Sequence, residues 1–351
     1  MLKMNEATLI LEDGTRYKGY SFGAEHCANG EVVFSTAMTG YTESLTDPSY
    51  SGQMIVLTYP LAGNYGVPGS GFWESGRIYA QALIVSDYSD SYSHWNAVES
   101  LGDWLKRENV AAITGIDTRS LAKRLRDRGV MCGKIEIEGV DNTQNIIEYG
   151  SVNYIAQVSC KEVILYNAGA AKRVVLVDLG VKSNIIRCLV QRGVEVMRVP
   201  WDYDFHNLDY DGVLLSNGPG NPDNCPETVE HIKCAMREDK PIFGICLGNQ
   251  LLAKAGGASI YKLKYGHRGH NQPVRHIGTN RCFITSQNHG YAVDDKTLGQ
   301  DWEPLFVNMN DGSNEGILNR EKPWFSVQFH PEAAAGPTDT GFLFDEFIKL
   351  L

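Results

Sequence analysis

The order of apolar and polar positions changes character near residue 172. From there to the end, short apolar runs alternate with amphipathic segments of helical period. The pattern predicts strands over 173–178, 194–199, 212–216, 241–245 and 324–327, and helices over 183–192, 228–237 and 249–255. Alternation of this kind indicates a doubly wound, mostly parallel α/β sheet. In such sheets a functional site forms beyond the carboxyl ends of the strands.

The first part of the chain has a different order of elements. Strand patterns come early, and helical patterns follow late. We predict strands over 7–12, 31–36 and 54–59, and helices over 95–108 and 120–128. This order is typical of an α+β domain. Residues 151–171 show no long period, so we expect an N-terminal α+β domain over 1–150, a linker over 151–171 and a second domain over 172–351.

Composition excludes several classes of protein. A length of 351 residues fits two domains at about 150 residues each. The net charge of −10 argues against nucleic acid or an anionic membrane as a partner. No apolar run approaches the ~20 residues that a membrane helix needs, and residues 1–6 lack the apolar core of a signal peptide. We therefore expect a cytoplasmic protein.

Among the eight cysteines, Cys246 stands apart. No Cys-x-x-Cys pair occurs, so we expect neither a disulfide framework, nor a zinc ribbon, nor another metal site. Cys246 lies in Gly244-Ile-Cys-Leu-Gly248, between a predicted strand and a predicted helix. Flanking glycines permit the sharp turn of a nucleophile elbow, and the start of a helix favours a thiolate. The alternative is an inert core cysteine on a glycine-rich turn.

Two other segments at strand ends complete a hydrolytic site. His330 and Glu332 are two positions apart after the strand 324–327, so both side chains can face the same way. A cysteine nucleophile requires such a base, oriented by a carboxylate. The Gly218-Pro-Gly220 loop follows the strand 212–216 and can aim N–H groups at an oxyanion together with the N–H of Leu247. Taken alone, the Gly218-Pro-Gly220 loop could be an ordinary turn, and His330 could be an ordinary surface or core histidine.

These three motifs resemble those of the class I, triad-type glutamine amidotransferases, over roughly residues 172–351. The first half narrows the resemblance to the small subunit of carbamoyl phosphate synthetase. The segments similar to that family are 38–53, 58–66, 115–119, 265–274 and 286–293.

The resemblance implies site residues. Cys246, His330 and Glu332 would be the catalytic triad. L-Glutamine would be held by Ser49, Gly218, Gly220, Leu247, Gln250, Asn288, Gly290 and Tyr291. Gln250 is one helical turn past Cys246, on the same face. Since Ser49 belongs to the first domain, the glutamine pocket would lie between the two domains.

The resemblance also implies an activity. Cys246 would release ammonia from glutamine through a γ-glutamyl thioester. A large subunit would use this ammonia, bicarbonate and ATP to make carbamoyl phosphate for arginine or pyrimidine biosynthesis, which makes the enzyme a carbon–nitrogen ligase. The chain has no phosphate-binding Gly-x-x-x-x-Gly-Lys-Ser/Thr loop. We therefore expect no cofactor on this chain, ATP and magnesium on the partner, and a heterodimer or a higher oligomer of it.

Two positions depart from the family pattern, and three alternatives remain. Asn249 replaces a common His beside the elbow, and Asn221 replaces a common Asp in the Gly-Pro-Gly loop. The chain could be the glutaminase subunit of another synthetase, although those subunits lack the first 150 residues. It could also be a partner-independent thiol hydrolase such as a γ-glutamyl peptidase. The third alternative is a catalytically inactive docking subunit.

Overall fold

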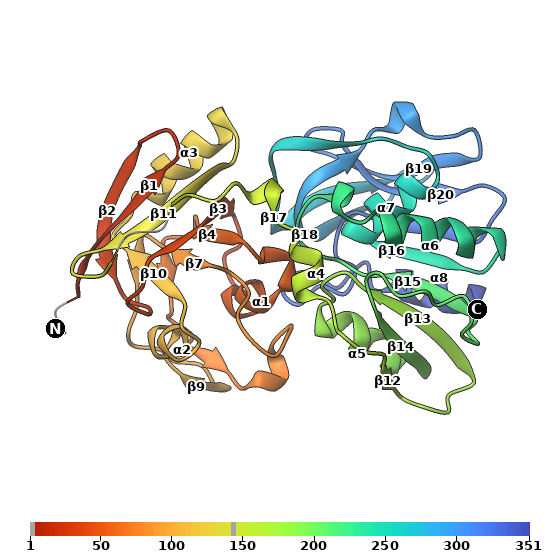
Figure 1. Cartoon of the computed structure of the whole chain (residues 1–351), viewed down its shortest axis with the longest axis horizontal. Helices are drawn as coiled ribbons and strands as arrows, with labels where there is room; N and C mark the ends of the chain where they lie inside the picture. Colours follow the sequence, from red (N-terminus) through yellow and green to blue (C-terminus); the bar gives the residue numbers. More distant parts are fainter. Residues whose placement is uncertain (1–3, 142–144) are drawn as a thin grey trace. The chain divides into compact units, whose positions relative to one another are not determined.

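The computed structural model describes residues 4–141 and 145–351 (Figure 1). It forms two compact units, Met1–Val152 and Asn153–Leu351. The sequence analysis expects no signal peptide in residues 1–6. Residues 1–3 of this segment lie outside the described residues. None of the described helices combines the length and the apolar character that crossing a membrane requires.

The first unit is built on a closed barrel with the strand order β1-β11-β3-β4-β7-β10-β2. Its strands are β1 (Glu6–Leu11), β2 (Arg16–Ser21), β3 (Ala28–Ser35), β4 (Gln53–Leu57), β7 (Ala82–Ile84), β10 (Ala111–Thr114) and β11 (Met131–Ile137). Two small sheets pair β5 (Leu61–Ala62) with β8 (Asp87–Tyr88), and β6 (Val67–Pro68) with β9 (Ala97–Glu99). The helical segments are α1 (Tyr41–Thr46), η1 (Pro48–Tyr50), η2 (Ser70–Phe72), α2 (Leu101–Arg107), α3 (Thr118–Arg128) and η3 (Tyr149–Ser151).

Part of this barrel is parallel. Strands β3, β4, β7 and β10 are consecutive neighbours and run in the same direction. Their carboxyl ends therefore meet at one edge. Helix α3 buries Leu121 and Leu125 in the same apolar cluster as Val32, Met54 and Ile113 from these strands. The amphipathic pattern of the helix thus fixes it against the parallel part of the barrel.

The second unit contains a ten-stranded sheet with the order β12-β14-β13-β15-β16-β21-β20-β19-β17-β18. Its strands are β12 (Ile164–Tyr166), β13 (Lys172–Asp178), β14 (Val194–Pro200), β15 (Gly212–Leu215), β16 (Ile242–Ile245), β17 (Ile260–His276), β18 (Cys282–Val293), β19 (Trp302–Asn308), β20 (Asn314–Asn319) and β21 (Trp324–Val327). Strands β14, β13, β15, β16 and β21 are parallel, and the others pair antiparallel.

Helices cover both faces of the parallel strands. The helical segments are α4 (Tyr154–Val158), α5 (Ser183–Gln191), η4 (Pro222–Asn224), α6 (Pro226–Arg237), α7 (Leu247–Ala255), η5 (Asp295–Thr297) and α8 (Phe342–Leu350). One core cluster joins Ile232 of α6 and Leu251 of α7 to Val213 of β15. The other cluster joins Leu189 of α5 and Phe344 of α8 to Leu214, the neighbour of Val213 in β15. Successive strand side chains point to opposite faces, so both faces of these apolar strands are buried.

The predicted fold class is confirmed, and the structure adds detail. The sheet continues beyond β21 with antiparallel strands that the sequence analysis did not assign. The predicted helix over 95–108 begins later, at Leu101, because Ala97–Glu99 forms β9. Residues 151–171 were expected to be a linker, but they contain α4 and the edge strand β12, which pairs with β14 in the second unit.

Candidate active site

Cys246 lies at the turn from β16 to α7, where the parallel strands end. Its φ and ψ angles are 55° and −103°, an uncommon conformation for a residue with a side chain. A Cβ at Gly244 would lie 2.6 Å from the Gly248 carbonyl oxygen, and a Cβ at Gly248 would lie 2.2 Å from the Leu215 carbonyl oxygen. Both glycines are therefore required by close backbone approach. The elbow predicted from the sequence is present.

His330 and Glu332 form a buried pair after β21. The Nδ1 atom of His330 lies 2.6 Å from Oε1 of Glu332. Burial lowers the pKa of His330, but the charge of Glu332 and an interaction with Cys246 outweigh it, and the net shift is upward. The Nε2 atom of His330 has no geometric hydrogen bond to any described residue. The imidazole thus has one nitrogen on a carboxylate and the other without a hydrogen bond to a described residue.

A lysine that the sequence analysis missed completes this pair. The Nζ atom of Lys182 lies 3.1 Å from Oε1 of Glu332, and both side chains are buried. Lys182 also donates a hydrogen bond to the carbonyl of Ala333. Burial raises the pKa of Glu332, whereas Lys182 and then His330 lower it, to about 2. Glu332 is therefore held as a carboxylate. The only sequence signal was a lysine four residues after a buried strand and directly before a helix.

The loop after β15 carries Gly218, one of the two residues whose N–H groups are predicted to bind an oxyanion. A Cβ at Gly218 would lie 2.1 Å from the Leu179 carbonyl oxygen, so the loop backbone packs tightly. The N–H of Gly248 donates to the Ser216 carbonyl, which ties this loop to the elbow. Across residues 4–141 and 145–351, the N–H groups of Gly218 and Leu247 have no hydrogen-bond acceptor. Two unused donors beside a nucleophile are what an oxyanion requires.

Strand β18 brings the predicted residues 288–291 to the elbow. The thiol of Cys246 lies 3.6 Å from the carbonyl oxygen of Asn288. The amide of Gln250 donates to the Tyr291 carbonyl at 3.2 Å, and Gly290 lies between these residues in the same strand. Gln250, Asn288, Gly290 and Tyr291 are thus grouped around Cys246. Gly220, at φ 89°, belongs to the loop after β15.

The two departures from the family pattern have structural explanations. Asn249 is fully buried. Its Nδ2 donates to Oε1 of Gln328 at 3.0 Å, and its Oδ1 accepts from Ser326 at 2.8 Å. Asn249 therefore ties the elbow helix to the strand that leads to His330. The Oδ1 of Asn221 accepts from the N–H of Asp223 at 3.0 Å and caps η4, a role that an aspartate could also fill.

Ser49 lies in the first unit, in η1. It is buried, and its N–H donates to Oδ1 of Asp47 at 2.9 Å. Its contact with glutamine stays a prediction.

Two side-chain groups of the second unit bring possible metal-ligand atoms within 4.8 Å of one another. They are Asp204, His206 and His231, and His267, His289 and Glu315. The second group is a buried network, in which Asn308 donates to Glu315 at 2.7 Å and His289 Nδ1 lies 2.8 Å from the Tyr291 carbonyl oxygen. Through these hydrogen bonds the network stabilises strand β18, which carries the residues predicted to bind glutamine.

Comparison with known proteins agrees with this geometry. The family described as "Glutamine amidotransferase class-I" matches residues 175–350. The family described as "Carbamoyl-phosphate synthase small chain, CPSase domain" matches residues 9–135. The chain belongs to the class I glutamine amidotransferase family, and it also carries the carbamoyl-phosphate synthase small-chain domain. Its first unit carries the small-chain domain, and its second unit carries the amidotransferase domain.

Several long proteins contain a region similar to this small chain. Multifunctional protein CAD of Squalus acanthias is 50% identical over 98% of this chain and 16% of its own length. Multifunctional protein URA2 of Saccharomyces cerevisiae is 48% identical over 97% of this chain and 17% of its own. The mitochondrial carbamoyl-phosphate synthase [ammonia] of Aquarana catesbeiana is 49% identical over 100% of this chain and 24% of its own. The small chain therefore spans between about a sixth and a quarter of these relatives.

Proposed function

We propose that this chain hydrolyses L-glutamine and supplies the ammonia for carbamoyl phosphate synthesis. The observation that carries the proposal is the convergence of Cys246, the His330–Glu332 pair and two unused N–H donors at one end of the parallel sheet. The family assignment supports glutamine as the amide donor.

The first chemical step is acyl transfer to sulfur. The Cys246 sulfur attacks the side-chain amide carbon of glutamine, and the carbonyl oxygen takes up the negative charge. The N–H groups of Gly218 and Leu247 stabilise this oxyanion, and one such donor is typically worth about 3 kcal/mol. His330, held protonated by Glu332, gives its proton to the leaving nitrogen. The products of this step are ammonia and a γ-glutamyl thioester.

The second step returns the enzyme to its starting state. His330 takes a proton from water, which attacks the thioester carbon. The same N–H groups stabilise the second oxyanion, and glutamate leaves with Cys246 restored. Glu332 keeps the imidazole oriented in both steps, because its Oε1 accepts from Nδ1 and leaves Nε2 toward the reaction.

The ammonia requires a synthetase that uses ATP and bicarbonate. We infer that this synthetase is a separate large subunit or a further part of a fused chain, as the multifunctional relatives suggest. The names of the relatives CAD and URA2 favour pyrimidine biosynthesis over arginine biosynthesis. A cytoplasmic location stays a prediction.

The decisive test compares two nitrogen donors. With a synthetase partner, Cys246→Ser should abolish carbamoyl phosphate synthesis from glutamine and preserve synthesis from ammonium salts. This comparison matters because some relatives are named for ammonia. Glutamine-dependent synthesis that survives in Cys246→Ser would overturn the nucleophile assignment. A wild-type chain that supports only ammonia would favour the inactive docking subunit.

A further inference from the structure

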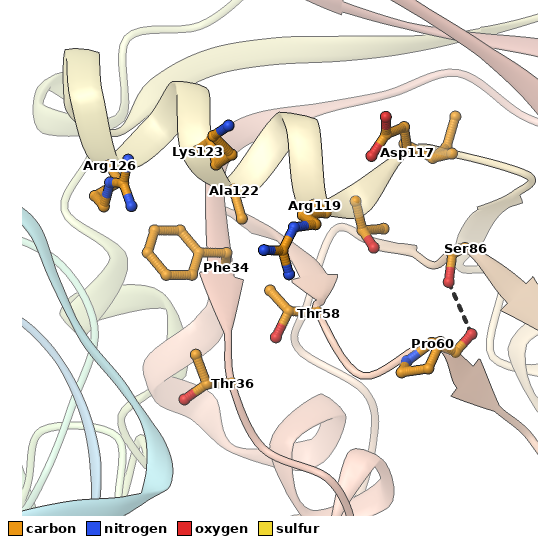
Figure 2. Close-up of a pocket in the computed structure, with 12 residues that line it drawn as sticks. Phe34, Thr36, Thr58, Pro60, Ser86, Asp117, Arg119, Ala122, Lys123 and Arg126 are labelled. Carbon is orange, nitrogen blue, oxygen red and sulfur yellow. Dashed lines mark hydrogen bonds between the residues drawn. The ribbon is translucent and has the colours of Figure 1, made fainter.

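The first unit contains an open cavity of about 700 Å³ that belongs to neither the triad nor the glutamine set. Figure 2 shows its lining, with helix α3 above and strand ends below. The residues on which the argument depends are Phe34, Thr58, Ser86, Arg119, Lys123 and Arg126. The volume lies within the ~300–1,000 Å³ that small-molecule sites occupy.

The cavity lies at the carboxyl ends of four neighbouring parallel strands. Thr36 follows β3 directly, and Thr58 follows β4 directly. Ser86 is two positions past β7, and Ile116 is two positions past β10. All four residues line the cavity. In closed α/β barrels, ligand sites also lie at the carboxyl ends of the parallel strands, so the position favours a ligand site.

Helix α3 presents cations to this cavity. Arg119, Lys123 and Arg126 are spaced four and three residues apart, so they share one helix face over ~10 Å. The side chains of Arg119 and Lys123 form no ion pair or hydrogen bond with any residue in 4–141 or 145–351, and the Arg126 side chain pairs only with its exposed neighbour Asp127. On the same helix Arg124, which does not line the cavity, is neutralised by Asp13 at 2.6 Å. At the cavity, Arg119 and Lys123 are thus the cations whose side chains have no partner among the described residues.

The remaining lining adds two other kinds of contact. The hydroxyl of Thr58 donates to the Ser35 carbonyl at 3.0 Å, and that of Ser86 donates to the Pro60 carbonyl at 2.8 Å. Since their protons are used, these oxygens can accept hydrogen bonds from ligand hydroxyls. Phe34 offers an apolar ring to the cavity that Arg119 also lines (Figure 2).

We propose that this cavity binds a phosphorylated small molecule of the nucleotide class. Its phosphates lie along Arg119, Lys123 and Arg126, which match the length of an oligophosphate better than a single carboxylate. Its sugar hydroxyls donate to Thr58 and Ser86, and its ring packs on Phe34. The one carboxylate in the lining, Asp117, is engaged as the cap of α3, where it accepts from the N–H of Ser120 at 2.8 Å.

The test is calorimetric titration of the full chain with ATP, UTP and inorganic tripolyphosphate. We expect saturable binding of a nucleotide, and a tenfold or greater loss of affinity in Arg119→Gln/Lys123→Gln, since two charge-assisted contacts with phosphate are lost. The matched control is Lys18→Gln/Lys106→Gln, which removes two exposed cations of the same unit outside the cavity. Its affinity should stay within about twofold of wild type, because distant surface charges are screened.

Further arms separate the possible results. Binding should persist in Cys246→Ser, so its outcome is independent of the proposed glutaminase reaction. Tripolyphosphate that binds as tightly as the nucleotides would overturn the assigned roles of Thr58, Ser86 and Phe34. Binding of poly-L-glutamate without any nucleotide binding would overturn the proposal in favour of an acidic protein segment. Equal loss of affinity in both double variants would show that only the overall charge matters.

Discussion

The Nζ atom of Lys182 lies 3.1 Å from Oε1 of Glu332, the same oxygen that lies 2.6 Å from Nδ1 of His330. A single carboxylate oxygen therefore meets two cationic groups in a buried site. Lys182 also contacts the loop after β15, because its backbone N–H donates to Oδ1 of Asn217 at 3.0 Å. The lysine thus connects the His330–Glu332 pair to the loop that carries Gly218.

Replacing Lys182 by Met should reduce both stability and turnover. Removing one partner of a buried ion pair typically costs about 3–5 kcal/mol of unfolding free energy. Without Lys182, burial favours the neutral form of the Glu332 carboxyl, and a neutral carboxyl no longer holds His330 protonated. We therefore expect kcat for glutamine hydrolysis to fall about tenfold or more. Denaturant unfolding and steady-state glutaminase assays measure the two effects. Lys296→Met, at an exposed position, is the control, and equal turnover in both variants would contradict this role.

Replacing Gly218 by Ala should damage the oxyanion site. The new Cβ would meet the Leu179 carbonyl oxygen at 2.1 Å, so the loop must move and take its N–H with it. Loss of one oxyanion donor typically costs about 10²–10³ in kcat. Gly299→Ala is the matched control, because its nearest neighbour would be 3.6 Å away. A Gly218→Ala enzyme with unchanged kcat would show that this N–H does not meet the oxyanion.

The Asn249 contacts predict a difference between two substitutions. In Asn249→Leu, Ser326 and Gln328 lose their buried partner, which should cost about 1–3 kcal/mol of stability. In Asn249→His, one ring nitrogen can donate and the other can accept, so the loss should be smaller. Urea unfolding curves of the two variants check this order. The reverse order would mean that the volume of the side chain at position 249, rather than its hydrogen bonds, determines stability.

The His267 network predicts a dependence of stability on pH. Burial lowers the pKa of His267, but the hydrogen bonds with Asp311 and Glu315 outweigh it and raise the pKa to about 9. A raised pKa of a base stabilises the fold below its unfolded value near 6.5, and this stabilisation is lost as pH rises through about 9. The stability advantage of wild type over His267→Gln should therefore shrink by up to about 3 kcal/mol over this range. A constant difference in unfolding free energy from pH 6 to 10 would refute it.

Much of the site could be predicted because its chemistry is local in sequence. The Gly-Ile-Cys-Leu-Gly turn, the His330-Pro-Glu332 segment and the Gly218 loop each follow a short apolar strand. Such runs identify buried parallel strands, and parallel strands place their carboxyl ends together. The residues proposed as nucleophile, base and oxyanion donors therefore come together once the sheet forms.

Other features could not be predicted, for physical reasons. Strand β17 runs for 17 residues, but much of it is exposed and polar, so no alternation of apolar residues marks it. From the sequence, Lys182 would be assigned to the surface, because buried lysines are rare. Only the fold shows that Glu332 lies beside it. The short strand β12 has partly exposed residues and resembles a loop in sequence.

The central claim is that Cys246 forms a covalent bond with the γ-glutamyl group. Incubation with isotope-labelled glutamine, rapid acid quench and peptide mass spectrometry would locate that bond. The account predicts a labelled γ-glutamyl adduct on the peptide that contains Cys246, absent in Cys246→Ser. Label on another cysteine, or ammonia release by Cys246→Ser at the wild-type rate, would contradict it.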